Sequence, residues 1–413
     1  MGQSYVVIGD GIAGSTAAET LREEAPDAEI LVITDEGEAL YNRILIKEFA
    51  KGKLPEAPIA IHETDWYAER DIDLRLNTHV TSVDADDHLI HTHTGEKYSY
   101  DKLLVATGGT PKQLPVEGSH GNGIHHFWTF QDARAIREAA EQAENAVIIG
   151  AGLLGIDLAA ICGAQSVTAH YLMRGERWWR YALSEEGAAI IHDAMRDLDV
   201  KPVFNSGADY FELDEDENVV ATVDANGDRY ESEFVGVAIG LDFNTEFLGS
   251  TDIETDDGIV VDEHMRTSVE DIYAAGDITR FYDVITDDYE QNGSWGSAKT
   301  QGQVAARNMV ADGAEEEFRW VSSYSITHFD FPFLSFGHPT RGDRYIDRKY
   351  DDNSWRRIAL KNEKIIGGVL IGDLAPQTTL KRLIREEIPV GGFTDELLEA
   401  EIELDGVAPT PEG

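Results

Sequence analysis

The sequence predicts an α/β protein with two three-layer domains built on parallel sheets, followed by a smaller α+β domain. First, two short apolar runs, 5–8 and 146–149, each lead into a glycine-rich turn and a helical pattern. Second, 413 residues are enough for two or three domains. Third, after residue 318 the strand–turn–helix order ends, and alternating apolar residues followed by one helical pattern take its place.

Both turns carry three glycines with the spacing Gly-x-Gly-x-x-Gly, which are Gly9, Gly11 and Gly14 in the first and Gly150, Gly152 and Gly155 in the second. Such a turn lets backbone N–H groups and a helix N-terminus approach a pyrophosphate, which larger side chains would obstruct. Two of them predict two Rossmann-like domains and two dinucleotides. Two dinucleotides held by one chain usually exchange electrons.

The composition is strongly acidic, with 34 Lys and Arg against 78 Asp and Glu and a formal net charge of -44. Nucleic acids and anionic lipid surfaces would be repelled, so we expect neither as a partner. The acidic residues are scattered, and lysines are few, which suits a halophilic protein whose self-repulsion is screened by salt. We also expect a cytoplasmic protein, since the chain starts without a basic leader and has no apolar run long enough for a membrane span.

The first domain continues with a helix over 13–24 and a strand over 29–34, which ends at Asp35 and Glu36. A carboxylate about 20 residues after the glycines can bind an adenosine ribose, and either of these two is a candidate. Alternatively, an acid stands at this position by chance, because the whole chain is rich in acids, and it binds no ribose. Farther along, strands end in small-residue turns at Ala106-Thr107-Gly108 and at Gly276-Asp277. Such turns admit a ligand close to the backbone.

These four motifs, in this order over about 5–308, resemble the FAD-dependent pyridine nucleotide-disulfide oxidoreductases with two dinucleotide-binding domains. The run Leu40-Tyr41-Asn42-Arg43-Ile44-Leu45 is similar to the flavin portion of NAD(P)H nitrite reductases and to rubredoxin and ferredoxin reductases. The resemblance implies FAD in the first domain and NADPH or NADH in the second. It implies FAD contacts at Gly9, Gly11, Gly14, Asp35, Glu36, Arg43, Val80, Ala106, Thr107, Gly108, Gly276, Asp277 and Trp295.

Individual roles follow from the same resemblance. Asp277 would bind the ribityl chain, and Arg43 the pyrophosphate. A helix beginning near Ser294 would direct its N-terminus at the flavin, with Trp295 at the flavin edge or packed between domains. Relatives often have Ser-Lys four and five residues after the arginine, whereas this chain has Lys47-Glu48. Lys47 is therefore either a group near flavin N5 or a solvated helix charge.

In the second domain the candidate NAD(P) contacts are Gly150, Gly152, Gly155, Asp157, Arg174 and Gly240. Relatives more often have glutamate where this chain has Asp157, which is expected near the nicotinamide but reaches less far. Arg174 follows the strand over 167–173, where no acid stands immediately at the tip. An arginine there can pair with a 2′-phosphate, which favours NADPH. Alternatively the local arginines pair with Glu176, Glu185 and Glu186, and Glu176 contacts the ribose.

The chain has a single cysteine, Cys162, so it has no internal disulfide and no Cys-x-x-Cys pair. The disulfide-reducing and peroxide-reducing branches of the family place a redox cysteine near 41–49, and none is found there. Cys162 lies in an apolar helical pattern, which predicts an inert core thiol.

We expect an FAD-binding domain over 1–115 and 238–317, an NAD(P)-binding domain over 116–237, a C-terminal α+β interface domain over 318–407 and a disordered tail over 408–413. His328 and its aromatic neighbours either touch the flavin or form sheet core. By the resemblance, the C-terminal domain makes dimer contacts or faces the flavin.

The predicted function is FAD-dependent NAD(P)H oxidation. Electrons would pass through flavin N5, without a redox-active cysteine, to a ferredoxin-like or rubredoxin-like carrier or a nitrite reductase partner. The alternatives are a quinone-reducing NADH dehydrogenase, an oxygen-reducing NADH oxidase, a flavin monooxygenase and a binding protein that keeps FAD as a structural plug.

Overall fold

The computed structural model describes residues 2–311, 315–399 and 402. They form two compact units. Unit 1 comprises Met1–Ile46, Pro55–Thr110 and Leu241–Trp320, and unit 2 comprises Lys47–Leu54, Pro111–Gly240 and Val321–Gly413. The chain therefore leaves and re-enters unit 1. The predicted tail, 408–413, lies outside the described residues.

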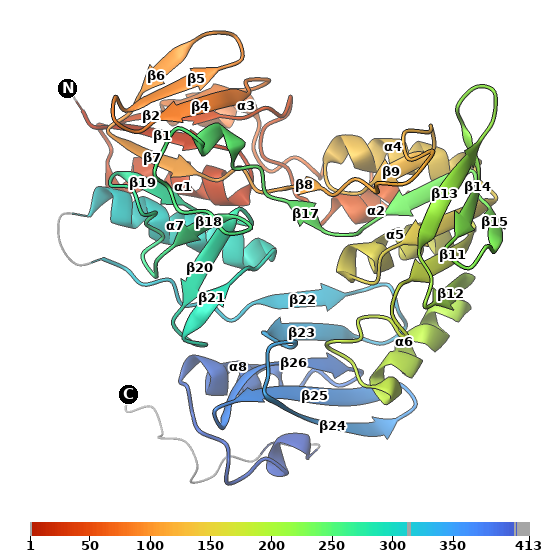
Figure 1. The fold of residues 1–413 in the computed structure, drawn as a ribbon. Helices are drawn as coiled ribbons and strands as arrows, with labels where there is room; N and C mark the ends of the chain where they lie inside the picture. Colours follow the sequence, from red (N-terminus) through yellow and green to blue (C-terminus); the bar gives the residue numbers. More distant parts are fainter. Residues whose placement is uncertain (1, 312–314, 400–401, 403–413) are drawn as a thin grey trace. The chain divides into compact units, whose positions relative to one another are not determined.

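Unit 1 is built on a five-stranded parallel sheet (Figure 1). Its order is β19 (Ile272–Ala274), β7 (Lys102–Val105), β1 (Ser4–Ile8), β2 (Glu29–Ile33) and β3 (Ile72–Arg75). Apolar residues fill β1 because a central parallel strand is covered on both faces. The long helices α1 (Ile12–Glu24) and α7 (Trp295–Val310) pack closely on each other, since a Cβ at Gly302 would lie 2.2 Å from the carbonyl oxygen of Ala13.

Smaller elements complete unit 1. One antiparallel sheet contains β4 (Val80–Asp84), β5 (Leu89–Thr92) and β6 (Lys97–Ser99). A mixed sheet contains β18 (Ile259–Val261), β20 (Thr279–Asp283) and β21 (Asp288–Glu290). The short helices are α3 (Thr64–Ala68) and η1 (Glu246–Leu248). The two-residue strands β8 (Thr110–Pro111) and β17 (Leu241–Asp242) pair with each other, and unit 1 ends within β8, at Thr110.

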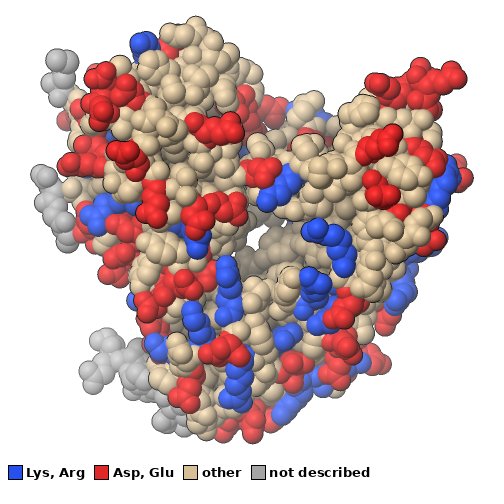
Figure 2. Space-filling view, viewed as in Figure 1, with Lys and Arg blue, Asp and Glu red and all other residues tan. Residues whose placement is uncertain are grey.

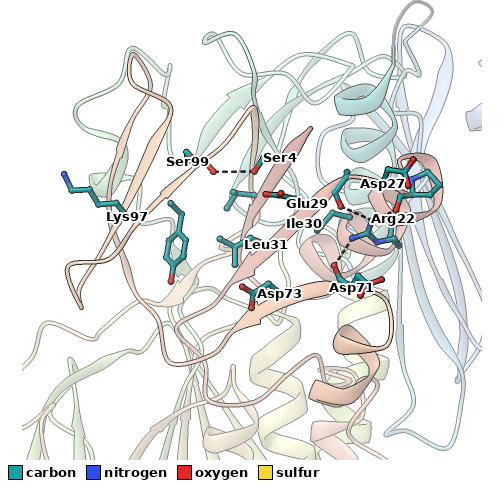
Figure 3. Close-up of a pocket in the computed structure, with 14 residues that line it drawn as sticks. Ser4, Arg22, Asp27, Glu29, Ile30, Leu31, Asp71, Asp73, Lys97 and Ser99 are labelled. Carbon is teal, nitrogen blue, oxygen red and sulfur yellow. Dashed lines mark hydrogen bonds between the residues drawn. The ribbon is translucent and has the colours of Figure 1, made fainter. Parts of the chain in front are cut away.

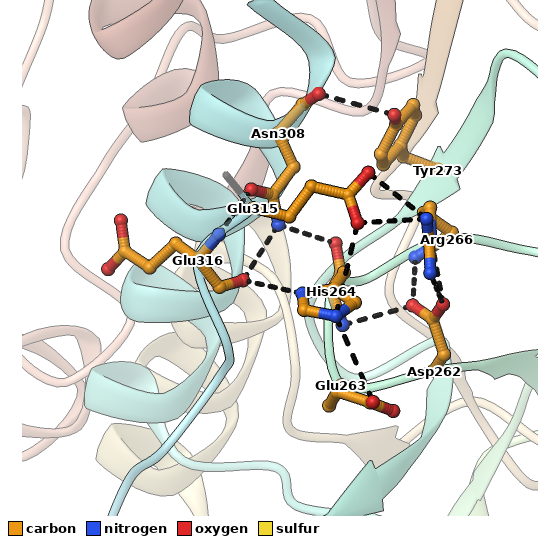
Figure 4. A network of polar contacts seen from close by, with 8 residues as sticks. All are labelled: Asp262, Glu263, His264, Arg266, Tyr273, Asn308, Glu315 and Glu316. Carbon is orange, nitrogen blue, oxygen red and sulfur yellow. Dashed lines mark hydrogen bonds and ion pairs between the residues drawn. The ribbon is translucent and has the colours of Figure 1, made fainter. Parts of the chain in front are cut away.

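A polar network holds the chain that follows α7 (Figure 4). The amide of Asn308 donates to the backbone oxygens of His264 and Glu316, at 3.0 and 2.8 Å, and accepts from the Glu316 N–H at 2.8 Å. Arg266 bridges the carboxylates of Asp262 and Glu315. The buried amide of Asn308 is thus satisfied by backbone groups, which fixes the exit from α7 against the loop before β19.

Unit 2 contains a second parallel sheet, in the order β12 (Val200–Phe204), β11 (Thr168–Met173), β10 (Asn145–Ile149), β16 (Phe234–Val237) and β9 (Ile124–His126). Its helices are α4 (Phe130–Gln142), α5 (Leu153–Ala164) and α6 (Glu185–Asp197), and the short helix α2 (Ile46–Ala50) joins this unit through Lys47. A three-stranded antiparallel sheet contains β13 (Ala208–Leu213), β14 (Val219–Asp224) and β15 (Arg229–Glu231).

The C-terminal part of unit 2 is a five-stranded antiparallel sheet, in the order β22 (Ser323–Ile326), β23 (Phe333–Gly337), β26 (Lys364–Ile371), β25 (Ser354–Lys361) and β24 (Arg344–Asp351). Helix α8 (Gln377–Arg385) contacts β26 and β23, and η2 (Glu396–Leu398) follows. A Cβ at Gly187 of α6 would lie 2.8 Å from the ring of Trp355, so α6 packs directly on β25. Phe333 and Phe336 are buried in sheet core.

The predicted architecture, with two parallel-sheet domains and an antiparallel C-terminal sheet, is confirmed. Asp and Glu side chains are spread over the whole visible face instead of gathering in one region (Figure 2). No helix in the described part of the chain is long and apolar enough to cross a membrane.

Candidate functional site

The first glycine turn is shaped by backbone contacts. Gly9 has φ +106°, and a Cβ there would lie 2.3 Å from the Ala106 carbonyl oxygen. A Cβ at Gly14 would lie 1.9 Å from the Gly9 carbonyl oxygen. Gly11 differs, because its Cβ would meet nothing within 4 Å. Gly11 is also the N-cap of α1 and offers no capping side chain, so the helix N-terminus is open to an anionic ligand.

The second turn repeats this geometry in unit 2. Gly150 has φ +121°, and its Cβ would lie 2.0 Å from the Ala238 carbonyl oxygen. At Gly155 a Cβ would lie 2.2 Å from the Tyr171 hydroxyl. Gly152 is the uncapped N-cap of α5, again with open space where a Cβ would be. Each turn therefore has two glycines required by packing and one required only if a ligand binds.

The two acids after β2 have different surroundings. Glu36 accepts a hydrogen bond of 2.7 Å from the Tyr41 hydroxyl and pairs with Arg43. Asp35 is exposed and lies 3.9 Å from a ring nitrogen of His79. The structure thus brings Glu36 and Arg43 together, and it leaves Asp35 at the surface.

Asp277 follows Gly276 (φ +85°) at the end of β19. Burial raises the pKa of Asp277 to about 6, although the nearby positive charge of Arg43 acts in the opposite direction. Burial and the charge of Arg43 are the influences on this carboxylate, and no hydrogen bond from another described residue contributes. A desolvated acid without a donor fits a ligand hydroxyl, as the ribityl chain of FAD would supply. Together with the open end of α1 and with Arg43, this arrangement fits FAD.

The remaining predicted FAD residues lie in different parts of unit 1. Ala106 continues β7 and donates its N–H to the Ile8 carbonyl oxygen at 2.7 Å. Thr107 is exposed, and Gly108 (φ +65°) faces open space. Val80 is 6% exposed and belongs to the hydrophobic core. Trp295 is half-buried at the first position of α7, whose N-cap is Ser294.

Asp157 is the centre of a buried polar cluster in unit 2, which we call the Asp157 network. Its members are Lys47, Glu48, Lys51, Asp157, Tyr324 and His328. Asp157 Oδ1 lies 2.5 Å from His328 Nε2, and Oδ2 accepts from the Tyr324 hydroxyl at 2.8 Å. The network joins α2, α5 and the segment 324–328 within the same unit.

Two sequence-based interpretations are wrong here. Lys47 is no solvated helix charge, because its side chain is 11% exposed and its ammonium lies 3.7 Å from Asp157 Oδ1. His328 belongs neither to a strand nor to the aromatic sheet core, since its imidazole binds Asp157. Sequence reasoning missed Lys51 and Tyr324 entirely. The only available signal was the spacing of Lys47 and Lys51, which puts both on one side of a helix.

The ionisation of Asp157 is set by its neighbours. Burial alone would raise the pKa of its carboxyl group. The hydrogen bond from His328 and the charge of Lys47 outweigh burial, so the pKa of Asp157 lies below its ordinary value. Burial lowers the pKa of His328, although the hydrogen bond to Asp157 opposes this. The pair is therefore a carboxylate and a neutral imidazole near neutral pH.

The other NAD(P) candidates lie at strand ends. Arg174 is exposed immediately after β11 and makes no ion pair with any residue that the structure describes. Arg177, in contrast, pairs with Glu176 and donates to the Leu183 carbonyl oxygen. The expectation that local arginines pair with acids therefore holds for Arg177 and fails for Arg174. Gly240 (φ +111°) accepts from the Lys112 N–H at 3.0 Å.

Unit 1 has a cavity of about 650 Å³ that we do not assign to a dinucleotide (Figure 3). It is lined by residues at the amino ends of β1 and β2, including Ser4 and Glu29. Ligands of open α/β sheets bind at the carboxyl ends of the strands. The guanidinium of Arg22 in this cavity is already bound to the backbone oxygens of Arg70, Asp71 and Ala28.

Cys162 is completely buried in α5, and burial raises the pKa of its thiol to about 12. The predicted core role is confirmed, because a thiol of this kind forms no thiolate near neutral pH. With one cysteine in 413 residues, the chain has no thiol pair for disulfide exchange.

Comparisons with known proteins agree with this geometry. Residues 3–303 match the family model of the pyridine nucleotide-disulphide oxidoreductases, and residues 325–388 match the rubredoxin NAD+ reductase C-terminal domain. The ferredoxin–NAD(+) reductase component of the biphenyl dioxygenase system from Paraburkholderia xenovorans is 31% identical over 276 residues, which are 67% of this chain and 67% of that protein. The NADH-rubredoxin oxidoreductase of Clostridium acetobutylicum is 27% identical over 380 residues, with 92% and 93% coverage.

Among solved structures, the covalent putidaredoxin reductase–putidaredoxin complex contains a chain that matches with a TM-score of 0.91 at 23% identity, over 98% of both chains. At this identity the likeness shows the fold. The first family model covers most of the sequence and includes both glycine turns. The chain therefore belongs to the pyridine nucleotide-disulphide oxidoreductase family, and it is an FAD-dependent NAD(P)H oxidoreductase.

Proposed function

We propose that this protein passes electrons from NAD(P)H through FAD to a small electron-carrier protein of the rubredoxin or ferredoxin kind. The observation that carries the proposal is the combination of two open glycine turns with a single, buried cysteine. A member of this family without a thiol pair cannot reduce its acceptor by disulfide exchange. Relatives named as rubredoxin and ferredoxin reductases support the choice of acceptor.

The chain's own residues bind and orient the two dinucleotides in this proposal. The open N-terminus of α1 would hold the FAD pyrophosphate with help from Arg43, Glu36 would bind the adenosine ribose, and Asp277 would accept from the ribityl hydroxyls. Asp35 is the weaker ribose candidate because it is exposed at the surface. When bound, FAD supplies the ability to take up two electrons as a hydride and to release them singly.

In unit 2 the N-terminus of α5 would bind the NAD(P) pyrophosphate. We propose that Arg174 pairs with a 2′-phosphate and makes NADPH the preferred reductant, because its guanidinium is exposed and forms no ion pair within the described chain. NADH is the alternative, and the names of the relatives favour it.

The proposal also covers where the protein works, at what salt concentration, and through which surface it meets its partner. We propose a cytoplasmic protein that works at high salt, where its net charge of -44 is screened and an acidic carrier can approach. The C-terminal sheet, which matches a rubredoxin reductase domain, would form the dimer or carrier contact. A separate nitrite reductase subunit is a second acceptor that the resemblance of residues 40–45 favours.

The test is to mix the flavin-loaded protein anaerobically with NADPH or NADH and to record the absorbance of the flavin over time. Steady-state assays with rubredoxin, ferredoxin, quinone, nitrite and oxygen at about molar salt then compare acceptors. We expect bleaching by NAD(P)H and the highest kcat/KM with a carrier protein. A protein that binds no flavin, or whose flavin is reduced by neither dinucleotide, would disprove the electron-transfer function. Faster turnover with quinone or oxygen than with every carrier would disprove the acceptor.

A further inference from the structure

The hydrogen-bond geometry of the Asp157 network assigns its protons. Lys51 Nζ lies 2.6 Å from His328 Nδ1 and 2.8 Å from Glu48 Oε1. An ammonium group has donors but no acceptor, so His328 Nδ1 must accept. A neutral imidazole that accepts at Nδ1 carries its proton on Nε2, and this nitrogen lies 2.5 Å from Asp157 Oδ1. His328 is therefore a neutral bridge that accepts from Lys51 and donates to Asp157.

The same assignment balances the charges. Lys47 and Lys51 are positive, Glu48 and Asp157 are negative, and the sum is zero when His328 is neutral. The side chains of Lys51 and His328 are only 2% and 1% exposed. An unbalanced charge at such a depth would be strongly unfavourable. The other titratable neighbours are Tyr324, the buried Tyr171 and the exposed Lys53. Burial raises the pKa of the Tyr324 hydroxyl well above the ordinary value, so it stays a donor.

Lys47 forms an ion pair but no hydrogen bond with the residues that the structure describes. Its Nζ lies 3.7 Å from Asp157 Oδ1, which is an ion-pair distance and too long for a hydrogen bond. It also lies 5.7 Å from the centre of the Tyr324 ring, a cation–π contact. The aspartate carboxylate is too short to bind Lys47 closely, and the imidazole of His328 occupies the adjacent position on the same oxygen.

We propose that His328 is a positioning residue for hydride transfer at the NAD(P) site. By holding Asp157 from one side, it keeps the short carboxylate ionised and oriented two residues after the last glycine of the turn, and through Asp157 it fixes the charged ammonium of Lys47. His328 neither gives nor takes a proton in this role. The inference rests on the proposed function, and it adds a residue from the C-terminal sheet region to the dinucleotide site.

The test compares two substitutions at the same position in the full-length, flavin-loaded protein. In His328→Gln the side-chain amide can donate to Asp157 and accept from Lys51 but cannot become charged, whereas His328→Phe can do neither. We expect His328→Phe to slow flavin reduction by NAD(P)H about tenfold or more, while the affinity of the oxidised, flavin-loaded protein for NAD(P)+ changes less than about threefold. His328→Gln should keep most of the rate. The exposed His120 provides the matched control, His120→Gln.

A second variant tests the role of the short carboxylate. Asp157→Glu, placed in the His328→Phe protein, lengthens the acid by one methylene group so that it reaches Lys47 directly. We expect this double variant to recover most of the rate of flavin reduction, and a double variant as slow as His328→Phe alone would contradict the role given to the short carboxylate. If His328→Gln is as slow as His328→Phe, or if His328→Phe is as fast as the original protein, the positioning role is wrong.

One readout does not require activity. The ¹⁵N chemical shifts of His328 near pH 7 should show a protonated Nε2 and an unprotonated Nδ1. An imidazolium or a protonated Nδ1 would overturn the inference even if the enzyme is active. If His328→Phe does not fold, Lys51→Met replaces it. Loss of the Lys51 charge and of its hydrogen bond to Nδ1 should then let Nδ1 take up a proton, so the ¹⁵N shifts should show the imidazolium at a higher pH than in the original protein. Failure of the original protein to react with NAD(P)H would instead reject the proposed function.

Discussion

The hydroxyl group of Tyr67 donates a hydrogen bond of 2.7 Å to Asp10 Oδ1 inside the first glycine turn. It also lies 2.9 Å from Ser15 Oγ at the start of α1. Asp10 Oδ2 is buried and has no hydrogen-bond partner in the described part of the chain. Burial raises the pKa of Asp10 to about 7, and the Tyr67 hydrogen bond opposes this only in part. Asp10 is thus a titrating acid beside the expected position of the FAD pyrophosphate.

We predict that Asp10→Asn weakens the pH dependence of FAD binding and of stability. Since the folded protein holds the Asp10 proton more tightly than the unfolded chain does, stability falls as pH rises from about 4 to about 7. The asparagine variant should melt higher than the original at about pH 8, and its FAD affinity should stay level where that of the original declines. Thermal melts and FAD titrations at several pH values measure this. Parallel pH profiles would contradict it, and Tyr67→Phe is the control for the hydrogen bond alone.

Substitution of the open glycines should separate folding from binding. Gly11→Ala and Gly152→Ala place a methyl group in open space, so both proteins should fold with unchanged melting temperatures in the absence of ligand. Gly11→Ala should lose FAD affinity by about tenfold or more, because its Cβ would occupy the pyrophosphate path. Gly152→Ala should keep FAD and raise the KM for NAD(P)H. Gly392, also open, supplies the control Gly392→Ala, and equal ligand binding by all three variants would show that the turns hold no pyrophosphate.

Arg174→Ala tests the dinucleotide preference. If Arg174 binds the 2′-phosphate, its removal should lower kcat/KM for NADPH by about tenfold or more and leave that for NADH nearly unchanged. The surface arginine of α6 gives the control Arg196→Ala, which loses only an exposed pair with Asp193. A wild-type preference for NADH, or equal losses with both dinucleotides, would refute this role.

Cys162→Ala should leave electron transfer intact. The thiol is buried in α5 and its pKa is raised, so it takes no part in redox chemistry. We expect turnover within about twofold of the original and a modest loss of stability from the small cavity. Alkylation of the folded protein by a thiol reagent should be absent until denaturant is added. A large loss of turnover in a well-folded variant would show that the thiol is needed.

Salt should stabilise the protein. With a net charge of -44, the acidic side chains repel one another at low ionic strength. The screening length falls to about 3 Å at 1 M salt, so this repulsion weakens. We predict that the melting temperature rises between about 0.1 M and about 1 M salt, with NaCl and KCl acting alike. Sucrose at matched osmolality is the uncharged control. A melting temperature independent of salt would exclude charge screening as a source of stability.

Local sequence signals predicted much of the fold and of both turns. Gly9, Gly14, Gly150 and Gly155 are recognisable because close backbone approach leaves no room for a Cβ, and that constraint is present within a few residues of sequence. The alternating pattern after residue 318 likewise predicted an antiparallel sheet, since side chains on a strand alternate between faces.

The sequence by itself thus determined the fold class, the two glycine turns and the absence of thiol chemistry, since each depends on residues adjacent in the chain or on composition. Only the tertiary structure decided the surroundings of Asp157. His328 and Lys51 are 277 residues apart, and His328 and Asp157 are 171 apart, yet they form one buried chain of hydrogen bonds. No local pattern encodes such a contact, because it arises where separate elements pack together and the buried charges must find partners.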